Sequence, residues 1–322
     1  MRVRSDFLLP VAVLSLFGLA AGQEHHHNLT EEELGSVRFA TSCSQEVAAD
    51  FNRAVALLHS FQYEKADQAF SQVSSRDPEC AMAQWGVAMA NHHGLWDNGD
   101  MNRGRLAWQK ANEIAANNSQ TTVREKAYID ALGEVYKQDG KDKYAHAQAF
   151  EQKMGAVQAA DPDDSEAAIF HALALEIAAS PTDKTFTNQR KCGEILEPIF
   201  QQQPRHPGVA HYIIHCYDNP VLAEKALPAA RAYAKIAPAS AHAQHMPSHI
   251  FTRVGFWDES IASNQNSAAT ATKDEATSRT ARRATSACTP WIISSTPICK
   301  AGASNRRRLS STKCIPCRPL LA

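Results

Sequence analysis

The feature that most constrains the fold is a recurring unit in which an alanine-rich helical segment ends at a proline and another helix follows. Apolar residues three and four positions apart predict the helices, and proline ends them because it lacks the backbone N–H that the next turn needs. In one unit Ala66, Phe70 and Pro78 are separated by four and eight residues. A small residue one turn before an aromatic one allows two antiparallel helices to pack closely. Similar endings are found at Asp77-Pro78, Asp161-Pro162, His206-Pro207 and Ala237-Pro238.

The region from 48 to 271 shows no convincing alternation of apolar and polar residues, so we expect no β-sheet there. Helical pairs of roughly 34 residues recur instead, which predicts an all-α chain of stacked helical hairpins. Two places depart from the pattern. The region 94–143 is longer than one repeat and would interrupt the stack, and Pro247 would kink or restart a helix. The expected helices are 51–62, 63–76, 81–91, 144–160, 166–178, 192–203, 209–217, 222–235 and 241–254.

Several short segments of the body resemble known repeat sequences. They are Thr41–Ser44, Asp77–Ala83, Trp85–Gly86, Gly94–Trp96, His206–His215, His245–Phe251 and Trp257–Ser260. On these segments, the region 41–275 is similar to exported bacterial tetratricopeptide-repeat (TPR) proteins, a largely uncharacterised group. The resemblance implies a right-handed α-solenoid with a concave groove lined by the first helix of each pair. It implies no particular reaction.

The N-terminus predicts export. Two arginines precede an uncharged apolar run, Phe7–Ala21, which is too short to span a bilayer comfortably and is followed by small residues. We interpret residues 1–22 as a signal peptide cleaved before Gln23, with an uncleaved anchor helix as the alternative. No later segment is apolar enough to cross a membrane, so we expect a periplasmic or secreted protein. Residues 23–40, which are rich in His and Glu, are interpreted as a flexible leader.

The composition changes abruptly after Glu275. The body, 23–275, has 33 acidic residues against 22 basic ones, whereas 276–322 has nine basic residues and no acidic one. The acidic body excludes nucleic acid as an expected partner, because phosphates need a basic face. The tail is expected to be disordered. An alternative is a frameshift, since one permitted set of codons for Cys288–Lys300, read in a shifted frame, encodes a helical repeat segment.

Histidines dominate the expected first helices, which would line the groove. His211 and His215 are four residues apart and share one helical face, and His245 and His249 are spaced in the same way. Adjacent helices pack about 8–10 Å apart, so the two pairs are expected to converge. The groove candidates are His59, His92, His93, Trp96, His211, Tyr212, His215, His245 and His249.

The converging histidines have two interpretations. Neutral imidazoles from neighbouring helices are good ligands for zinc, copper or nickel, which makes His211, His215, His245 and His249 the metal candidates. His242 shares their face, but only if the helix does not restart at Pro247. The alternative is a set of partly buried histidines that bond to the backbone or to neighbours such as Asp218. No cofactor is required by the sequence.

The cysteines of the body predict a disulfide, and the absence of catalytic motifs from the sequence bears on the expected function. Cys43 and Cys80 precede the first helices of consecutive repeats, so stacking is expected to bring them within reach of a disulfide. No zinc-protease, nucleophile-elbow or phosphate-loop motif is present, so we expect a binding protein rather than an enzyme. The predicted function is an exported scaffold that takes a peptide or protein partner in a groove lined by His and Tyr. The alternative is a metal-binding protein or a metal-dependent hydrolase that uses the groove histidines.

Overall fold

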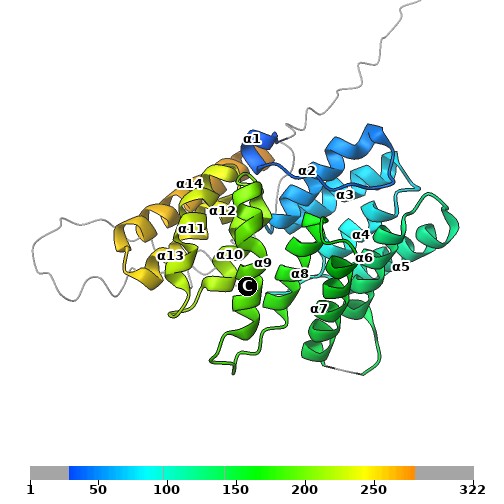
Figure 1. Ribbon diagram of the computed structural model, residues 1–322. Helices are drawn as coiled ribbons and strands as arrows, with labels where there is room; N and C mark the ends of the chain where they lie inside the picture. The colour runs from blue at the N-terminus through cyan, green and yellow to red at the C-terminus, as the bar shows by residue number, and fades with distance from the viewer. Residues whose placement is uncertain (1–28, 97, 141, 280–322) are drawn as a thin grey trace, which may run out of the picture.

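The computed structural model describes residues 29–96, 98–140 and 142–279, and every regular element within them is a helix (Figure 1). Consecutive helices pack against one another along the chain, so the all-α solenoid expected from the sequence is confirmed. The elements are α1 (Glu31–Leu34), η1 (Gln45–Val47), α2 (Ala48–His59), α3 (Tyr63–Arg76), α4 (Ala81–Ala90), α5 (Met101–Asn117), α6 (Val123–Tyr136), α7 (Lys143–Ala160), α8 (Ser165–Ile177), α9 (Thr187–Gln202), α10 (Pro207–Tyr217), η2 (Ala223–Ala226), α11 (Leu227–Ile236), α12 (Ala241–His245), α13 (Pro247–Val254) and α14 (Trp257–Arg279).

The two helices of each pair are buried to different extents. All of α4 except Gln84 is buried, and all of α10 except His215. By contrast, α3 buries only the stripe formed by Ala66, Phe70 and Val73. Helices that are apolar on all sides belong inside a fold, whereas one apolar stripe is typical of an outer helix. The first helix of each pair therefore lies on the inner side of the solenoid.

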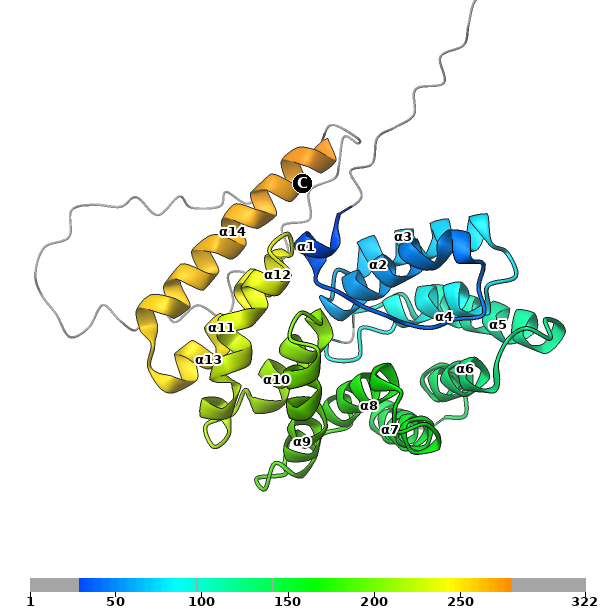
Figure 2. The ribbon, with the colours of Figure 1, turned by 45° about the horizontal axis from the view of Figure 1, so that its top comes forward.

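The helical pairs follow a tight arc that brings α10 back against α2 (Figure 2). Two polar contacts join the two helices. Tyr212 Oη lies 2.9 Å from His59 Nδ1, and His211 Nδ1 lies 2.6 Å from the backbone oxygen of His59. The inner faces of α2 and α10 thus touch each other.

Of residues 23–40, expected to form a flexible leader, 23–28 lie outside the described residues, and 29–40 pack against the rest of the fold. Leu34, Val37 and Phe39 are buried. Backbone hydrogen bonds hold the segment to the second half of the chain, from Ser36 N to Arg205 O at 3.0 Å and from Ala239 N to Glu33 O at 3.1 Å. The expectation was wrong because a short run of apolar residues between charges has no helical period to reveal it.

An aromatic cluster occupies the inside of the arc. The Phe39 ring lies 5.3–6.3 Å from the rings of four aromatic residues that come from four inner helices. Every member of the cluster is buried. This part of the inner surface is therefore filled by the chain itself, which bears directly on the expected groove. The four partners are Phe51, Trp85, Tyr128 and Phe170.

The two departures noted in the sequence have different outcomes. The region 94–143 contains α5 and α6, which continue the packing between α4 and α7, so the expected interruption is absent from it. The last expected first helix is broken at Met246, with α13 restarting at Pro247. Within the described ranges, no helix combines the length and apolarity needed to cross a bilayer. The predicted signal peptide and basic tail lie outside the described residues, apart from the end of α14.

Two disulfides join neighbouring repeats. The predicted bridge between Cys43 and Cys80 is present, with Cα atoms 4.8 Å apart, and it ties the start of the first pair to the start of the second. A second bridge, not predicted, links Cys192 of α9 to Cys216 of α10 with Cα atoms 6.1 Å apart. Both cysteines of this second bridge are fully buried. It fixes α10 to the outer helix of the preceding pair, directly beside His215.

Candidate metal centre

Helix α10 presents two histidines to the inside of the arc. Its start is well defined, because Pro207 occupies the first turn and the His206 side chain accepts a hydrogen bond from Val209 N at 3.4 Å. His211 and His215 follow one turn apart, so their side chains share a face. The break at Met246 ends α12 next to this face, which lets His242 approach α10 from a separate helix.

Three imidazole nitrogens meet at this point. His211 Nε2 lies 2.9 Å from His242 Nε2 and 3.1 Å from His215 Nε2. Their ligating nitrogens all lie within 4.8 Å of one another. We call these three residues the three-histidine centre. Two ligand nitrogens of a tetrahedral zinc ion are separated by roughly 3.3 Å, given Zn–N bonds of about 2.0–2.1 Å. The approach of the three nitrogens is therefore close to that of a ligand set.

The proton on His211 is placed by its surroundings. Its Nδ1 lies 2.6 Å from a backbone oxygen, which only accepts, so Nδ1 must carry the hydrogen. Neutral His211 therefore has a bare lone pair on Nε2, and two other imidazoles face this one lone pair. A single lone pair makes one good hydrogen bond, so one of the two close contacts stays unsatisfied unless a cation lies between the rings.

A second pair of imidazoles meets beside the first group. His245 Nε2 and His249 Nε2 are 3.0 Å apart. The other ring nitrogen of each residue has an acceptor of its own, Asn264 Oδ1 at 2.7 Å for His245 and Asp218 Oδ2 at 2.8 Å for His249. We call these two residues the histidine pair. Arg253 Nε donates to Asp218 Oδ1 at 2.8 Å, which holds the carboxylate in place.

Burial keeps the three-histidine centre neutral. Burial and the neighbouring imidazoles His215 and His242 hold the pKa of His211 well below its ordinary value. The pKa of His215 is lowered to about 3, mainly by burial and then by the charge of His249. Burial likewise holds the pKa of His242 well below the ordinary value. Neutral imidazole is the form that binds metal ions, because the ligand nitrogen must be free of its proton.

A different buried histidine group serves as an internal comparison. His59 Nε2 and His206 Nε2 each lie 3.0 Å from a different oxygen of Glu166. The remaining nitrogens accept from Tyr212 Oη and from Val209 N, so every donor meets an acceptor without any added cation. This group therefore needs no metal ion. Cys43 and Cys80, which lie close to Asp77, are joined in a disulfide and offer no thiolate.

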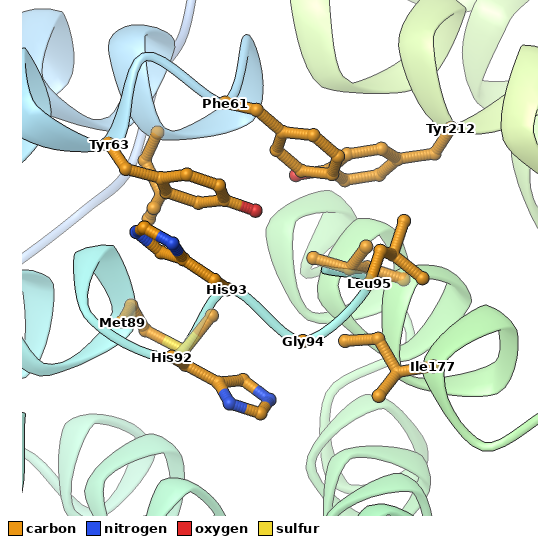
Figure 3. Close-up of a pocket in the computed structure, with 11 residues that line it drawn as sticks. Phe61, Tyr63, Met89, His92, His93, Gly94, Leu95, Ile177 and Tyr212 are labelled. Carbon is orange, nitrogen blue, oxygen red and sulfur yellow. The ribbon is translucent and has the colours of Figure 1, made fainter. Parts of the chain in front are cut away.

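Aromatic side chains cover one side of the three-histidine centre. The Phe61 ring lies 4.3 Å from the His211 ring, and Trp96 lies 5.5 Å from the His242 ring. Phe61 and His93 have left-handed backbones, with φ of 52° and 40°. Figure 3 shows Phe61 beside Tyr212, above a small cavity of about 10 Å³ that has room for one water molecule. The left-handed turn at Phe61 directs the ring toward the histidines.

The other groove candidates lie in different surroundings. His59 is completely buried beside Glu166, and Tyr212 donates to it. His92 lies next to Phe150, and the His93 ring stacks on Tyr63 at 4.0 Å while its Nδ1 contacts Asn98. The structure therefore spreads the candidates between the interior and the cavity wall. A peptide groove lined by them stays a prediction.

The four predicted metal ligands do not form one group. His211 and His215 do meet, but their third partner is His242, while His245 and His249 form a pair of their own. Met246 keeps helical backbone angles, φ −54° and ψ −36°, so His245 and His249 stay on one face across the start of α13, while His242 reaches His211 of α10. The alternative interpretation is correct in part, because His211 bonds to the backbone and His249 bonds to Asp218. Sequence reasoning missed Asn264 and the buried Glu166; a carboxylate near the start of a largely apolar helix is the signal that points to Glu166.

Comparison with known proteins adds nothing to this geometry. No protein-family model matches the chain, and no curated protein matches it at a significant level.

Proposed function

We propose that this protein binds a transition-metal ion at the three-histidine centre. The observation that carries the proposal is the convergence of His211, His215 and His242 through Nε2 atoms 2.9 and 3.1 Å apart, with the His211 proton held on the opposite side of its ring. A metal ion that lies among the three Nε2 atoms takes one bond from each neutral ring.

The ligand chemistry narrows the choice of ion. Imidazole nitrogen suits Zn²⁺, Cu²⁺ and Ni²⁺, whereas Ca²⁺ and Mg²⁺ prefer oxygen ligands. The hydrogen bond from His211 Nδ1 to the His59 carbonyl is the kind of outer contact that orients a ligating histidine. Three protein ligands leave a fourth position for water or a small molecule. The centre thus has the donor set of an ion-binding site with an open position.

The proposal includes the export predicted from the sequence. Two disulfides in the described part of the chain support an oxidising compartment, because reducing cytosol keeps most thiols free. The stacked helical pairs agree with the proposed TPR resemblance. We therefore propose an exported, TPR-like solenoid whose inner helices hold a metal ion.

Metal content tests the proposal directly. The full chain is stripped with chelator, loaded separately with Zn²⁺, Cu²⁺ or Ni²⁺, dialysed, and measured by inductively coupled plasma mass spectrometry. At least one of the three ions should stay bound at one equivalent or more. The triple variant His211→Ala/His215→Ala/His242→Ala should lose the ion at the three-histidine centre. Metal-free wild-type protein, or unchanged metal content in the triple variant, would refute the proposal.

A matched control separates specific binding from the general affinity of histidine for metals. His146 and His171 are outside the three-histidine centre and the histidine pair, and each contacts a side-chain oxygen nearby. The double variant of these residues to Ala should retain the full metal content. Circular dichroism checks that both variants keep their helices. Electron paramagnetic resonance of the Cu²⁺ form should show coupling to several nitrogens, which the control variant preserves.

A further inference from the structure

We infer that the histidine pair, His245 and His249, is a second and separate metal position beside the three-histidine centre. This inference rests on the proposed function, because it extends the same metal-binding region from one ion to two. The chemical class of the ligand is again a divalent transition metal. The second position uses two imidazoles from the protein and is completed by water or a small anion.

The protons of the pair are placed by its neighbours. The Asn264 amide nitrogen donates to Ser260 O at 2.9 Å, so its Oδ1 faces His245 and accepts from Nδ1 at 2.7 Å. His249 Nδ1 faces a carboxylate oxygen of Asp218, which also only accepts. Both Nδ1 atoms therefore carry hydrogen, and the two bare Nε2 atoms face each other at 3.0 Å. Two lone pairs at this distance repel unless a cation bridges them.

One ion at the three-histidine centre does not reach the pair. Ligands of a single zinc or copper ion lie about 2.0–2.1 Å from it, so their nitrogens are at most roughly 4.2 Å apart. The nitrogens of His211, His215 and His242 lie within 4.8 Å of one another, and neither member of the pair joins that set. The two groups are nonetheless neighbours, because the His242 and His245 ring centres are 6.3 Å apart. The region therefore holds five histidines in two groups, the three-histidine centre and the histidine pair.

The charge of Asp218 and the solvent exposure of His249 are compatible with a metal ion at the second position. Asp218 bonds to His249 from the side opposite the pair, an arrangement in which a carboxylate orients a ligating imidazole and offsets the charge of the metal. The side chain of His249 is 29% exposed, whereas His211 is fully buried. Solvent reaches the second position at His249, and exogenous ligands complete its coordination there.

The number of bound ions tests the inference. Metal-free full-length chain is titrated with Zn²⁺ and with Cu²⁺, passed through a desalting column, and measured for ions per chain. We expect two ions for the wild type and one for His245→Gln/His249→Gln, with the remaining ion lost on further replacement of the three-histidine centre. His146→Gln/His171→Gln is the matched control and should keep two.

Each other outcome has a definite meaning. One ion in both the wild type and the pair variant overturns the second position and leaves the proposed function standing. No ion in the wild type overturns both. Two ions in the pair variant overturn the inference, and so does complete loss from a folded pair variant, which would show one shared site.

A second variant keeps the test decisive if the pair variant does not fold. Asp218→Asn retains both imidazoles but removes the charge that orients His249. Loss of an outer-shell partner typically weakens metal affinity by about 10–100-fold. We expect a loss of this size for the second ion only, measured by competition with a chromophoric chelator. Equal weakening of both ions, or of neither, would contradict the inference.

Discussion

Individual residues in this interior are oriented by acceptors that come from other helices. The His59 carbonyl of α2 orients His211, Asp218 orients His249, and Asn264 of α14 orients His245. In each case the acceptor takes the proton of one ring nitrogen and exposes the other. A histidine whose lone pair is aimed in this way is a better ligand than one free to rotate, because less side-chain freedom is lost when the ion binds.

The buried Glu166 network shows the opposite arrangement, in which the histidines are donors. Both carboxylate oxygens of Glu166 accept an imidazole N–H. Burial alone would raise the pKa of Glu166, but the charges and hydrogen bonds of His206 and His59 hold it below the ordinary value. Glu166→Gln would place an amide N–H₂ against one imidazole N–H. We expect a loss of about 2–4 kcal/mol in the free energy of unfolding, since a buried donor is left unpaired.

Urea denaturation at pH 7 measures the effect of Glu166→Gln. Glu113→Gln on the exposed face of α5 is the matched control, and its effect should stay within about 0.5 kcal/mol. The Glu166→Gln variant should also retain metal more weakly, because His59 supplies the carbonyl that orients His211. Stability equal to that of the control would show that the carboxylate is dispensable.

Glu176 predicts a pH dependence of stability. Burial, and then the charge of Asp218, raises the pKa of Glu176 from 4.5 to about 8, and its Oε2 accepts no hydrogen bond among the described residues. Between pH 4.5 and 8 the folded protein keeps this proton and the unfolded chain loses it. The unfolded state then binds fewer protons, so the free energy of unfolding falls as the pH rises through this window.

Glu176→Gln should remove this part of the pH dependence. We expect the variant to gain about 2–4 kcal/mol over the wild type at pH 8 and little at pH 4.5, at about 1.4 kcal/mol for each tenfold difference in proton affinity. Guanidinium denaturation of the metal-free protein at pH 4.5, 6 and 8 gives the two curves. If the difference between them is constant across these pH values, Glu176 does not titrate as described.

At the level of the helices, close packing depends on small residues that face large ones. Gly86 of α4 lies against the Phe70 ring of α3, and a Cβ at position 86 would enter that ring. Phe70 is fully buried, so the ring has no room to move away. Gly86→Ala is therefore expected to cost about 1–3 kcal/mol, the usual cost of overpacking, although alanine is the better helix former.

A double-mutant cycle isolates the contact between these helices. Phe70→Leu makes room, so adding Gly86→Ala to this background should cost at least about 1 kcal/mol less than in the wild type. Thermal or urea unfolding of the four proteins gives the coupling energy. Additive effects would mean that the cost of Gly86→Ala arises within α4 itself and not from the Phe70 ring.

The helices expected from the sequence were predictable because their signals are local, whereas α5, α6 and α14 were not among them. Apolar spacing and the prolines at Pro78, Pro162, Pro207 and Pro238 mark boundaries that the structure reproduces within a few residues. Histidine spacing also predicted that His211 and His215 share a face. The contact from His59 to His211 spans 152 residues, and no local pattern indicates a contact across that separation.

The lack of a local signal for long-range contacts also explains two errors, one in the partner of His211 and one in the segment 29–40. Which of the remaining histidines joins His211 depends on how α12 lies relative to α10, and a proline signals the start of α13 without giving that arrangement. The ordered segment 29–40 was missed because its buried residues contact distant helices and not one another. Pairing of Cys192 with Cys216 follows from the packing of α9 on α10, which the spacing of the cysteines does not reveal.

On the scale of the whole molecule, the segment 29–40 closes the arc on which the metal region depends. Phe39 is 4% exposed at the centre of the aromatic cluster, and the Arg124 guanidinium lies 4.6 Å from its ring centre. The segment also bonds to Arg205 and Ala239 in the second half of the chain. It therefore holds α2 against α10, and α2 supplies the carbonyl that orients His211.

Phe39→Ala should consequently lower both stability and metal affinity. Truncating a buried phenylalanine costs about 3–5 kcal/mol. Phe150→Ala, at an equally buried position on α7, is the matched control and should cost a similar amount while leaving metal affinity unchanged. Chelator competition, at a temperature where both variants are folded, should show weaker binding only for Phe39→Ala. Equal affinities in the two variants would mean that the metal region holds its geometry without the closing segment, and that α10, α12 and α13 alone position the five histidines.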